Sequence, residues 1–217
     1  MVVRPNSKRQ VASQRGSRPV PLEDAQLIEK VKAGQTEAYG ELVRKYQDRV
    51  FNTCWRICGH LEDARDLTQE AFLKAFEGLA TFRHQSGFYT WIFRVAVNLA
   101  LSHRRDVKRR RTVSLDQNTE MAGTQAEGLA KRIGHRTEND DPVRSASDAE
   151  LQGAVVRALQ MLDDDHRAVV VLRDIEGFDY HDIGEVLDIP PGTVKSRLHR
   201  ARMALRQAIL PGLAHEG

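Results

Sequence analysis

Apolar side chains recur at three- and four-residue intervals through most of the chain, and few stretches show the strict alternation of a half-buried strand. Between residues 22 and 111 this periodicity predicts two helices that stop at Gly34 and Gly59, because glycine commonly follows the last turn of a helix. Two more helices are expected, from about 62 to 79 and from about 89 to 110. The sequence therefore predicts an all-α protein.

The periodicity resumes near Asp148 with a helix whose apolar spacing predicts one buried face. That face would contain Leu151, Ala154, Val155, Ala158, Leu159 and Leu162. Three acidic residues, 163–165, open the next helix near its N-terminal dipole, and Gly177 should end it. A short helix over 180–187, a turn with two prolines and a longer helix to about residue 210 follow, an order typical of a helix-turn-helix.

Between these stretches, residues 112–147 are rich in Gly, Thr, Glu and Asp and show no sustained periodicity. They predict a flexible linker, with room for one brief helix near 126–133. The chain should therefore hold two small helical domains, 22–111 and 148–210, which suits its length of 217 residues.

The two ends lie outside these domains. The first twenty residues carry five basic and no acidic side chains among Ser, Pro and Gln, so residues 1–21 predict a disordered basic tail. Such a tail is either a solubilising extension or a contact with nucleic acid, whose phosphates would attract it. Residues 211–217 are expected to be a short C-terminal tail.

No apolar run approaches the roughly 20 residues needed to cross a bilayer, and no signal peptide is evident. We therefore expect a cytoplasmic protein without direct insertion into a membrane. Its two cysteines, Cys54 and Cys58, lie four residues apart on a predicted helix, where reduced thiols pack as small apolar side chains. A zinc site with His60 is the alternative, although three ligands on one segment do not close a structural site.

The last helix separates into two faces when residues are placed at about 100° per step. Its packing face contains Val194, Leu198, Ala201, Leu205 and Ala208. The other face is polar and basic, so its side chains can reach base edges in a major groove and the phosphates beside it. Its members are Lys195, Ser196, His199, Arg202 and Arg206, with Arg200 on the flank. A merely solvated basic face is the alternative, which the preceding short helix and turn weaken.

The fourth helix also has two faces, and its buried side should contain Ile92, Phe93, Ala96, Leu99, Ala100 and Val107. On the other side an aromatic ring heads a polar and basic stripe, which suits single-stranded nucleic acid because a base can stack on the ring while cations hold the backbone. This stripe contains Trp91, Arg94, Asn98, Ser102, Arg105 and Arg109. The loop before it, residues 83–88, could form the wall of a base pocket. Alternatively, Trp91 caps the core and the arginines are solvated.

The third helix has an acidic outer face. Glu62, Asp66, Gln69, Glu70 and Glu77 surround Leu73 there. Such a face is poor for DNA but suited to docking a basic protein surface, although many acidic helix faces are only solvated. The sequence contains no Walker-type glycine loop, nucleophile elbow or HExxH pair, so we expect no enzyme, no cofactor and no metal.

Three segments, in this order, resemble motifs of a known family. The family's polymerase-docking helix is similar to DARDLTQEAFLKAFEGLATFR, its promoter-melting helix to FYTWIFRVAVNLALSHRR, and its upstream-element reader to YHDIGEVLDIPPGTVKSRLHRARMAL. The family is the sigma-70 superfamily of RNA polymerase sigma factors, in its extracytoplasmic-function (ECF) group. That group retains only sigma domains 2 and 4, which would correspond to residues 22–111 and to the helix-turn-helix domain 148–210.

The resemblance implies roles for residues on all three segments. Four residues of the third helix would face the clamp of core RNA polymerase: Asp66, Gln69, Glu70 and Leu73. The fourth helix and its preceding loop would recognise a flipped base of the −10 element and hold its strand through Arg83, Phe88, Trp91, Arg94, Asn98, Ser102 and Arg105. The last helix would meet the −35 element through Thr193, Lys195, Ser196, Arg197, His199 and Arg200.

The resemblance also implies a mechanism and partners. The protein would bind core RNA polymerase, place its last helix in the upstream duplex and trap unpaired bases near the start site. Promoter recognition, DNA melting and transcription initiation would then draw on binding energy rather than on catalysis. Core RNA polymerase and promoter DNA are the implied partners, together with an anti-sigma factor that holds the protein inactive.

Two other functions fit parts of the sequence. A stand-alone helix-turn-helix regulator would use the last domain on a palindromic site without polymerase, and would leave the acidic face and the Trp-Arg-Asn face unexplained. A helical protein-interaction adaptor would carry basic faces that are only solvated, and it would ignore promoter DNA whatever the salt concentration.

Overall fold

The computed structural model describes residues 21–82, 87–115 and 142–213, and every regular element in these ranges is a helix. The all-α prediction is confirmed for this part of the chain. None of the described helices is both long and apolar enough to cross a membrane. Nearly all of the predicted N-terminal tail, most of the predicted linker and the brief helix expected near 126–133 lie outside the described residues.

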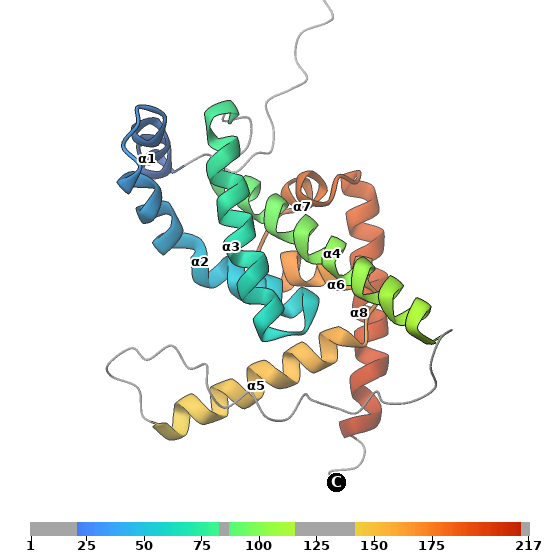
Figure 1. Ribbon diagram of the computed structural model, residues 1–217. Coiled ribbons are helices and arrows are strands. Elements are labelled where there is room, and N and C mark those ends of the chain that lie inside the picture. The colour runs from blue at the N-terminus through green and yellow to red at the C-terminus, as the bar shows by residue number, and fades with distance from the viewer. Residues whose placement is uncertain (1–20, 83–86, 116–141, 214–217) are drawn as a thin grey trace, which may run out of the picture.

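Four α-helices and a 3-10 turn form the N-terminal half: α1 (Leu22–Lys32), α2 (Glu37–Cys58), α3 (Leu61–Gly78), η1 (Leu79–Thr81) and α4 (Phe88–Leu115). The two predicted stops, Gly34 and Gly59, have φ angles of +91° and +83°, a backbone region that glycine adopts without strain. Helices α2, α3 and α4 lie side by side around an apolar core (Figure 1). The four helices predicted for this half are confirmed.

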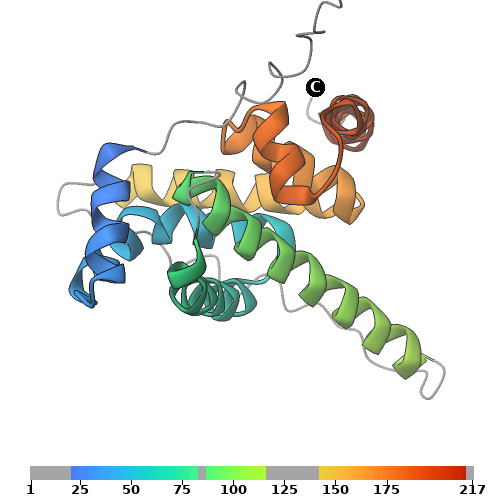
Figure 2. The ribbon, with the colours of Figure 1, turned by 90° about the horizontal axis from the view of Figure 1, so that it is seen from above.

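Helix α4 is longer than predicted. It begins at Phe88 and continues to Leu115, so its last turns occupy the start of the range expected to be a linker. Four residues of its predicted inner face are fully buried, namely Ile92, Phe93, Ala96 and Ala100, whereas Leu99 and Val107 are half-buried. Figure 2 shows the C-terminal turns of α4 projecting from the rest of the molecule.

The C-terminal half consists of α5 (Pro142–Gln160), α6 (Asp164–Val170), the π-helical turn η3 (Val171–Ile175), α7 (Tyr180–Leu187) and α8 (Pro191–Leu213). An aspartate caps each of the two short helices, which leaves fewer backbone N–H groups unpaired there. The Asp163 carboxylate accepts a hydrogen bond from the backbone N of His166 at 2.8 Å, and Asp179 accepts from the backbone N of His181 and Asp182.

The turn between α7 and α8 is tight, as a helix-turn-helix requires. Asp188 ends α7 with a φ of 55°, and Pro191 opens α8, where a missing N–H is tolerated. A Cβ atom at Gly184 would lie 2.7 Å from the carbonyl oxygen of Ile189, so only glycine lets α7 approach this turn. The predicted short helix, turn and long helix are confirmed.

The prediction for the buried face of α5 is wrong. Of its six residues only Leu159 and Leu162 are buried, while Leu151 is 64% and Val155 39% exposed. The buried side instead contains Gly153 and Val156, because α5 packs along α2 and reaches α8 with that side. The helix also begins at Pro142, inside the range expected to be a linker.

The two halves pack against each other. Helix α7 lies along α4, and α5 runs beside α2 (Figures 1 and 2). A single apolar cluster contains buried residues of both halves, such as Phe93 from α4 and Phe178 from the segment before α7. The sequence did not predict this arrangement, since it left the relative placement of the domains open.

Candidate nucleic-acid interface

The N-terminal half of α8 presents the polar face that the sequence predicted. Val194, Leu198 and Ala201 are buried at 0, 2 and 0% exposure and hold the helix on the domain. Four of the six residues predicted to meet the −35 element are exposed: Lys195, Ser196, His199 and Arg200. Thr193 is half-buried at the start of the helix, and its carbonyl accepts a hydrogen bond from Ser196 Oγ at 3.0 Å.

Arg197 differs from these neighbours because it points toward the N-terminus of α6. Its guanidinium lies 3.1 Å from a carboxylate oxygen of Asp165, and its side chain is only 29% exposed. Farther along α8, Arg202 forms an ion pair with Asp174 of the same domain. Two cations of this helix, Arg197 and Arg202, therefore already form ion pairs within the protein.

On α4, Trp91 partly covers the core and partly faces solvent. Its ring packs on Phe82 and Phe88, with centroids 4.8 and 5.8 Å away, and on Gly78, where a Cβ would lie 3.1 Å from the ring. Below it on the same side, Arg94, Asn98, Ser102 and Arg105 are exposed. Arg105 donates a hydrogen bond to Ser102 Oγ at 3.1 Å, which keeps the polar stripe continuous.

The structure places Phe88, which was predicted to contact DNA, inside the core. The ring is fully buried and packs near Tyr46 and Phe82, with centroids 5.7 and 6.5 Å away. The reason is that α4 starts at Phe88, which continues the buried stripe four residues before Ile92. That spacing was visible in the sequence. Arg83, the other residue proposed from this loop, lies outside the described residues.

The outer face of α3 contains the four residues predicted to dock core polymerase, and all are exposed: Asp66, Gln69, Glu70 and Leu73. Leu73 is 58% exposed, and Phe76 beside it is 39% exposed, so the apolar part of this face is larger than expected. Its charge is less purely acidic than predicted, since Lys74 lies 2.8 Å from Glu70.

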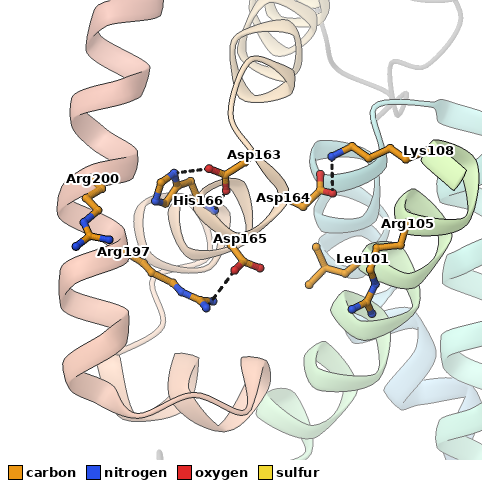
Figure 3. A pocket seen from close by; sticks show the side chains of 9 residues that line it. All are labelled: Leu101, Arg105, Lys108, Asp163, Asp164, Asp165, His166, Arg197 and Arg200. Atoms are coloured by element: carbon orange, nitrogen blue, oxygen red, sulfur yellow. Dashed lines mark hydrogen bonds and ion pairs between the residues drawn. The ribbon is translucent and has the colours of Figure 1, made fainter. Parts of the chain in front are cut away.

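A cavity of about 500 Å³ lies where α4, the start of α6 and α8 meet (Figure 3). It brings Arg105, proposed for the −10 element, to the same hollow as Arg197 and Arg200, proposed for the −35 element. Three consecutive aspartates, 163–165, also line it, and their pattern in the sequence had predicted only the start of a helix. No local pattern could reveal this meeting, because the contributing segments of α4, α6 and α8 are about thirty to one hundred residues apart in the sequence.

Of these three aspartates, Asp164 forms the most ion pairs. Arg104 Nε lies 2.6 Å and Lys108 Nζ 3.0 Å from its two carboxylate oxygens. Burial alone would raise the pKa of this carboxyl, but the hydrogen bonds from Lys108 and Arg104 outweigh burial and lower it. The group is therefore ionised at neutral pH and neutralises cations of α4.

The cysteines behave as packed apolar side chains. Burial raises the pKa of Cys54 to about 12 and that of Cys58 to about 11, so both are thiols at neutral pH. Cys58 Sγ donates to the carbonyl oxygen of His60. Among the described residues no group of His, Cys, Asp or Glu is arranged to hold a metal, so nothing there supports the zinc alternative.

Comparison with known proteins identifies the class of molecule. Residues 42–111 match Sigma-70 region 2, and residues 152–205 match Sigma-70 region 4. The fold resembles that of CnrH in complex with the cytosolic domain of CnrY, with a TM-score of 0.60, 23% identity and coverage of 88% of this chain and 98% of that one. The sigma factor RpoE in complex with the anti-sigma factor NepR, from Bartonella quintana, aligns with a TM-score of 0.57 and 22% identity over 79% of this chain and 96% of that chain. The protein is a sigma-70-family sigma factor, a promoter-recognition protein built of sigma domains 2 and 4.

Sequence relatives narrow the group. The chain is 36% identical to the RNA polymerase sigma-H factor of Pseudomonas aeruginosa, over 87% of this chain and 95% of that protein. It is 35% identical to the ECF RNA polymerase sigma factor SigW of Bacillus subtilis, over 84% of this chain and 94% of that protein. The chain belongs to the ECF group, as the three sequence motifs predicted.

Proposed function

We propose that this sigma factor binds core RNA polymerase and directs it to promoters by reading duplex DNA with α8 and unpaired DNA with α4. The observation that carries the proposal is the pair of exposed polar and basic faces, one on each sigma domain. The cycle consists of binding steps and DNA melting, so the protein acts as a non-enzymatic initiation factor without a cofactor. It would work in the cytoplasm, where bacterial chromosomal DNA is transcribed.

The upstream contact rests on α8. Lys195, Ser196 and His199 lie on the exposed side of its N-terminal half, the part of a recognition helix that reaches base edges in the major groove. Arg200 lies beside them and can donate two hydrogen bonds to one guanine or hold a phosphate. Thr193 and Arg197 complete the proposed −35 surface, the latter once Asp165 has released it.

The downstream contact rests on α4. The exposed part of Trp91 offers a stacking surface for an unpaired base, while Asn98, seven residues on and therefore roughly 10 Å along the helix, offers an amide for a base edge. Arg94 and Arg105 flank this line and would hold the strand's phosphates. Such a face traps melted DNA without requiring a chemical step.

The polymerase contact rests on α3. Leu73 supplies an exposed apolar centre, and Asp66, Gln69 and Glu70 surround it with acceptors suited to a basic protein surface. We further propose an anti-sigma factor as a regulatory partner. This proposal is supported by the sigma factor RpoE, a similar fold that was solved with the anti-sigma factor NepR.

The test is run-off transcription with sigma-free bacterial core polymerase, the purified protein and fragments of its source genome. We expect discrete transcripts that depend on the protein and fall on the order of tenfold in Asn98→Ala and Arg200→Ala, because one specific base contact contributes roughly 1–3 kcal/mol. Arg44→Ala, an exposed arginine of α2 outside the three proposed surfaces, is the matched control and should transcribe normally.

Two outcomes would contradict the proposal. A protein that shifts a specific duplex without core polymerase, and yields no transcripts, would be a stand-alone regulator. A protein with neither activity would be an interaction adaptor.

A further inference from the structure

The turn that precedes α7 inserts into the other domain. Glu176 belongs to the C-terminal domain, yet the residue is only 6% exposed, and its carboxylate contacts side chains of α2 and Tyr89 of α4. Arg49 Nε donates to one carboxylate oxygen at 3.2 Å, Thr53 Oγ1 donates to the other at 3.0 Å, and Arg56 lies 3.6 Å away. Arg49 also donates to the Glu176 backbone carbonyl at 3.1 Å.

An aromatic contact lies beside this ion pair. The Phe178 ring is 1% exposed and stacks on Tyr89 of α4, with ring centroids 4.8 Å apart and planes 13° apart. Phe93 packs against both rings, with its centroid 5.1 Å from Phe178 and 4.5 Å from Tyr89. Gly177 has a φ of +74° and turns the chain between the two anchors, so both the carboxylate and the ring reach into the N-terminal domain. We call residues 176–178 the latch.

A second set of contacts closes the far end of the interface. The carbonyl oxygens at the C-terminus of α2 accept hydrogen bonds from the C-terminal domain: Gln160 Nε2 donates to Arg56 and Arg167 donates to Ile57, at 3.1 and 2.9 Å. Nearby, Asp164 pairs across the interface with Lys108, a cation that DNA phosphates would otherwise attract, whereas Asp165 pairs with Arg197 inside its own domain (Figure 3).

This closed arrangement is incompatible with simultaneous promoter contacts. The −10 and −35 elements are named for positions that differ by about 25 base pairs, or roughly 85 Å of duplex at about 3.4 Å per base pair. Arg105 and Arg200, which belong to the two proposed DNA surfaces, line one cavity of about 500 Å³ here. The domains must therefore separate before both elements can be bound.

We propose that the latch holds the free sigma factor closed and thereby weakens its binding to promoter DNA until the domains separate. The inference rests on the proposed function for its consequence, but the latch itself is a property of the free chain. The C-terminal domain competes with DNA for a cation of α4, because the carboxylate of Asp164 occupies Lys108, which a phosphate would otherwise hold. Opening breaks the Glu176 contacts and frees Arg104 and Lys108 of α4 from Asp164.

Small-angle X-ray scattering of the purified full chain tests the closed state. Glu176→Gln and Arg49→Gln weaken one contact from opposite domains, and both should enlarge the radius of gyration relative to wild type. Asp174→Asn is the matched control, because this carboxylate lies two residues from Glu176 but pairs with Arg202 of its own domain. It should scatter like wild type. Arg49 is 48% exposed, so its variant keeps the test valid should the Glu176 variant fail to fold.

Run-off transcription tests the consequence. When the sigma factor is limiting, both latch variants should reach half-maximal transcription at a sigma-factor concentration about fivefold lower than the wild type requires. This is within the usual range for coupling between two sites. Latch variants as compact as wild type, or a wild type as extended as the variants, overturn the latch. If the variants are open but need the same sigma-factor concentration for half-maximal transcription, the latch does not weaken promoter binding. If no form of the protein supports transcription, the proposed function fails, whereas the scattering still decides the latch.

Discussion

At the scale of single residues, Arg167 stands out in the described part of the chain because it is a charged side chain in the core. It is fully buried, and burial, with repulsion from Arg104 next, lowers its pKa to about 10, so it stays charged at neutral pH. Its five-donor fork reaches backbone carbonyls at the ends of two helices, which carry partial negative charge. Leu159 accepts at 2.8 Å, Leu162 at 2.7 Å and Ile57 at 2.9 Å. One side chain thus joins α5, α6 and α2.

We expect Arg167→Ala to lower the free energy of unfolding by about 3 kcal/mol, because it leaves several buried carbonyls without a donor. Urea unfolding followed by circular dichroism measures this loss. Arg167→Lys should recover little of it, since an ammonium group cannot reproduce the planar fork. Arg44→Ala, an exposed control, should change stability by less than about 0.5 kcal/mol. A loss below about 1 kcal/mol in Arg167→Ala would show that water replaces these hydrogen bonds.

At the scale of elements, the short helix α7 and its turn set the angle at which α8 leaves the domain. Gly184 faces the carbonyl of Ile189, where a Cβ would come within 2.7 Å of the oxygen. The backbone N of Ile189 also bonds to the Gly184 carbonyl at 3.0 Å, so the turn has little freedom to move away. The close approach therefore fixes the position of the proposed reading helix.

Gly184→Ala should destabilise the protein by about 2 kcal/mol and weaken binding to promoter duplex, because the turn must shift and tilt α8. Gly192→Ala is the matched control: its added Cβ meets nothing within 4 Å, and it lies in the first turn of the same helix. Thermal unfolding and a fluorescence titration with promoter duplex measure the two effects. Equal behaviour of both variants would mean that the turn absorbs the extra methyl group.

At the scale of the whole molecule, the closed arrangement depends on ionised carboxylates between the domains. The pKa of Asp164 is lowered in the folded protein, so the ionised form is favoured there over the unfolded chain, whose Asp pKa is about 3.9. Its contribution is fully present above that unfolded value and is lost as the pH falls through the lowered, folded one.

The closed form should therefore keep its radius of gyration from neutral pH down to about pH 4 and expand below it. Scattering across this pH range measures the expansion. In Asp164→Asn the part of the transition that belongs to this group should be absent, because the amide does not titrate. Superimposable pH profiles for wild type and Asp164→Asn would show that other carboxylates control the opening.

Much of the fold was predictable because the signals that specify helices are local. The apolar spacing along α4 and α8, the glycines after α1 and α2 and the order of α7, turn and α8 all act within a few residues. The same locality made the exposed faces of α3, α4 and α8 visible in the sequence, so most of the proposed contact residues are exposed, as expected. Phe88 was expected in the loop because the helix predicted from the sequence began one residue later than α4 does.

Only the tertiary structure decided the contacts between residues that are far apart in the sequence. Local spacing could not tell which side of α5 is buried, since Leu151 and Val155 form an apolar stripe as regular as the buried one, and packing on α2 chose the other side. Neither the pairing of Arg197 with Asp165 nor the burial of Glu176 among Arg49 and Thr53 leaves a periodic trace. The sequence by itself determined the helices, the exposed faces of α3, α4 and α8, and the family. The folded chain determined how the two domains close on each other, because an interface depends on side chains that meet only after both of its surfaces exist.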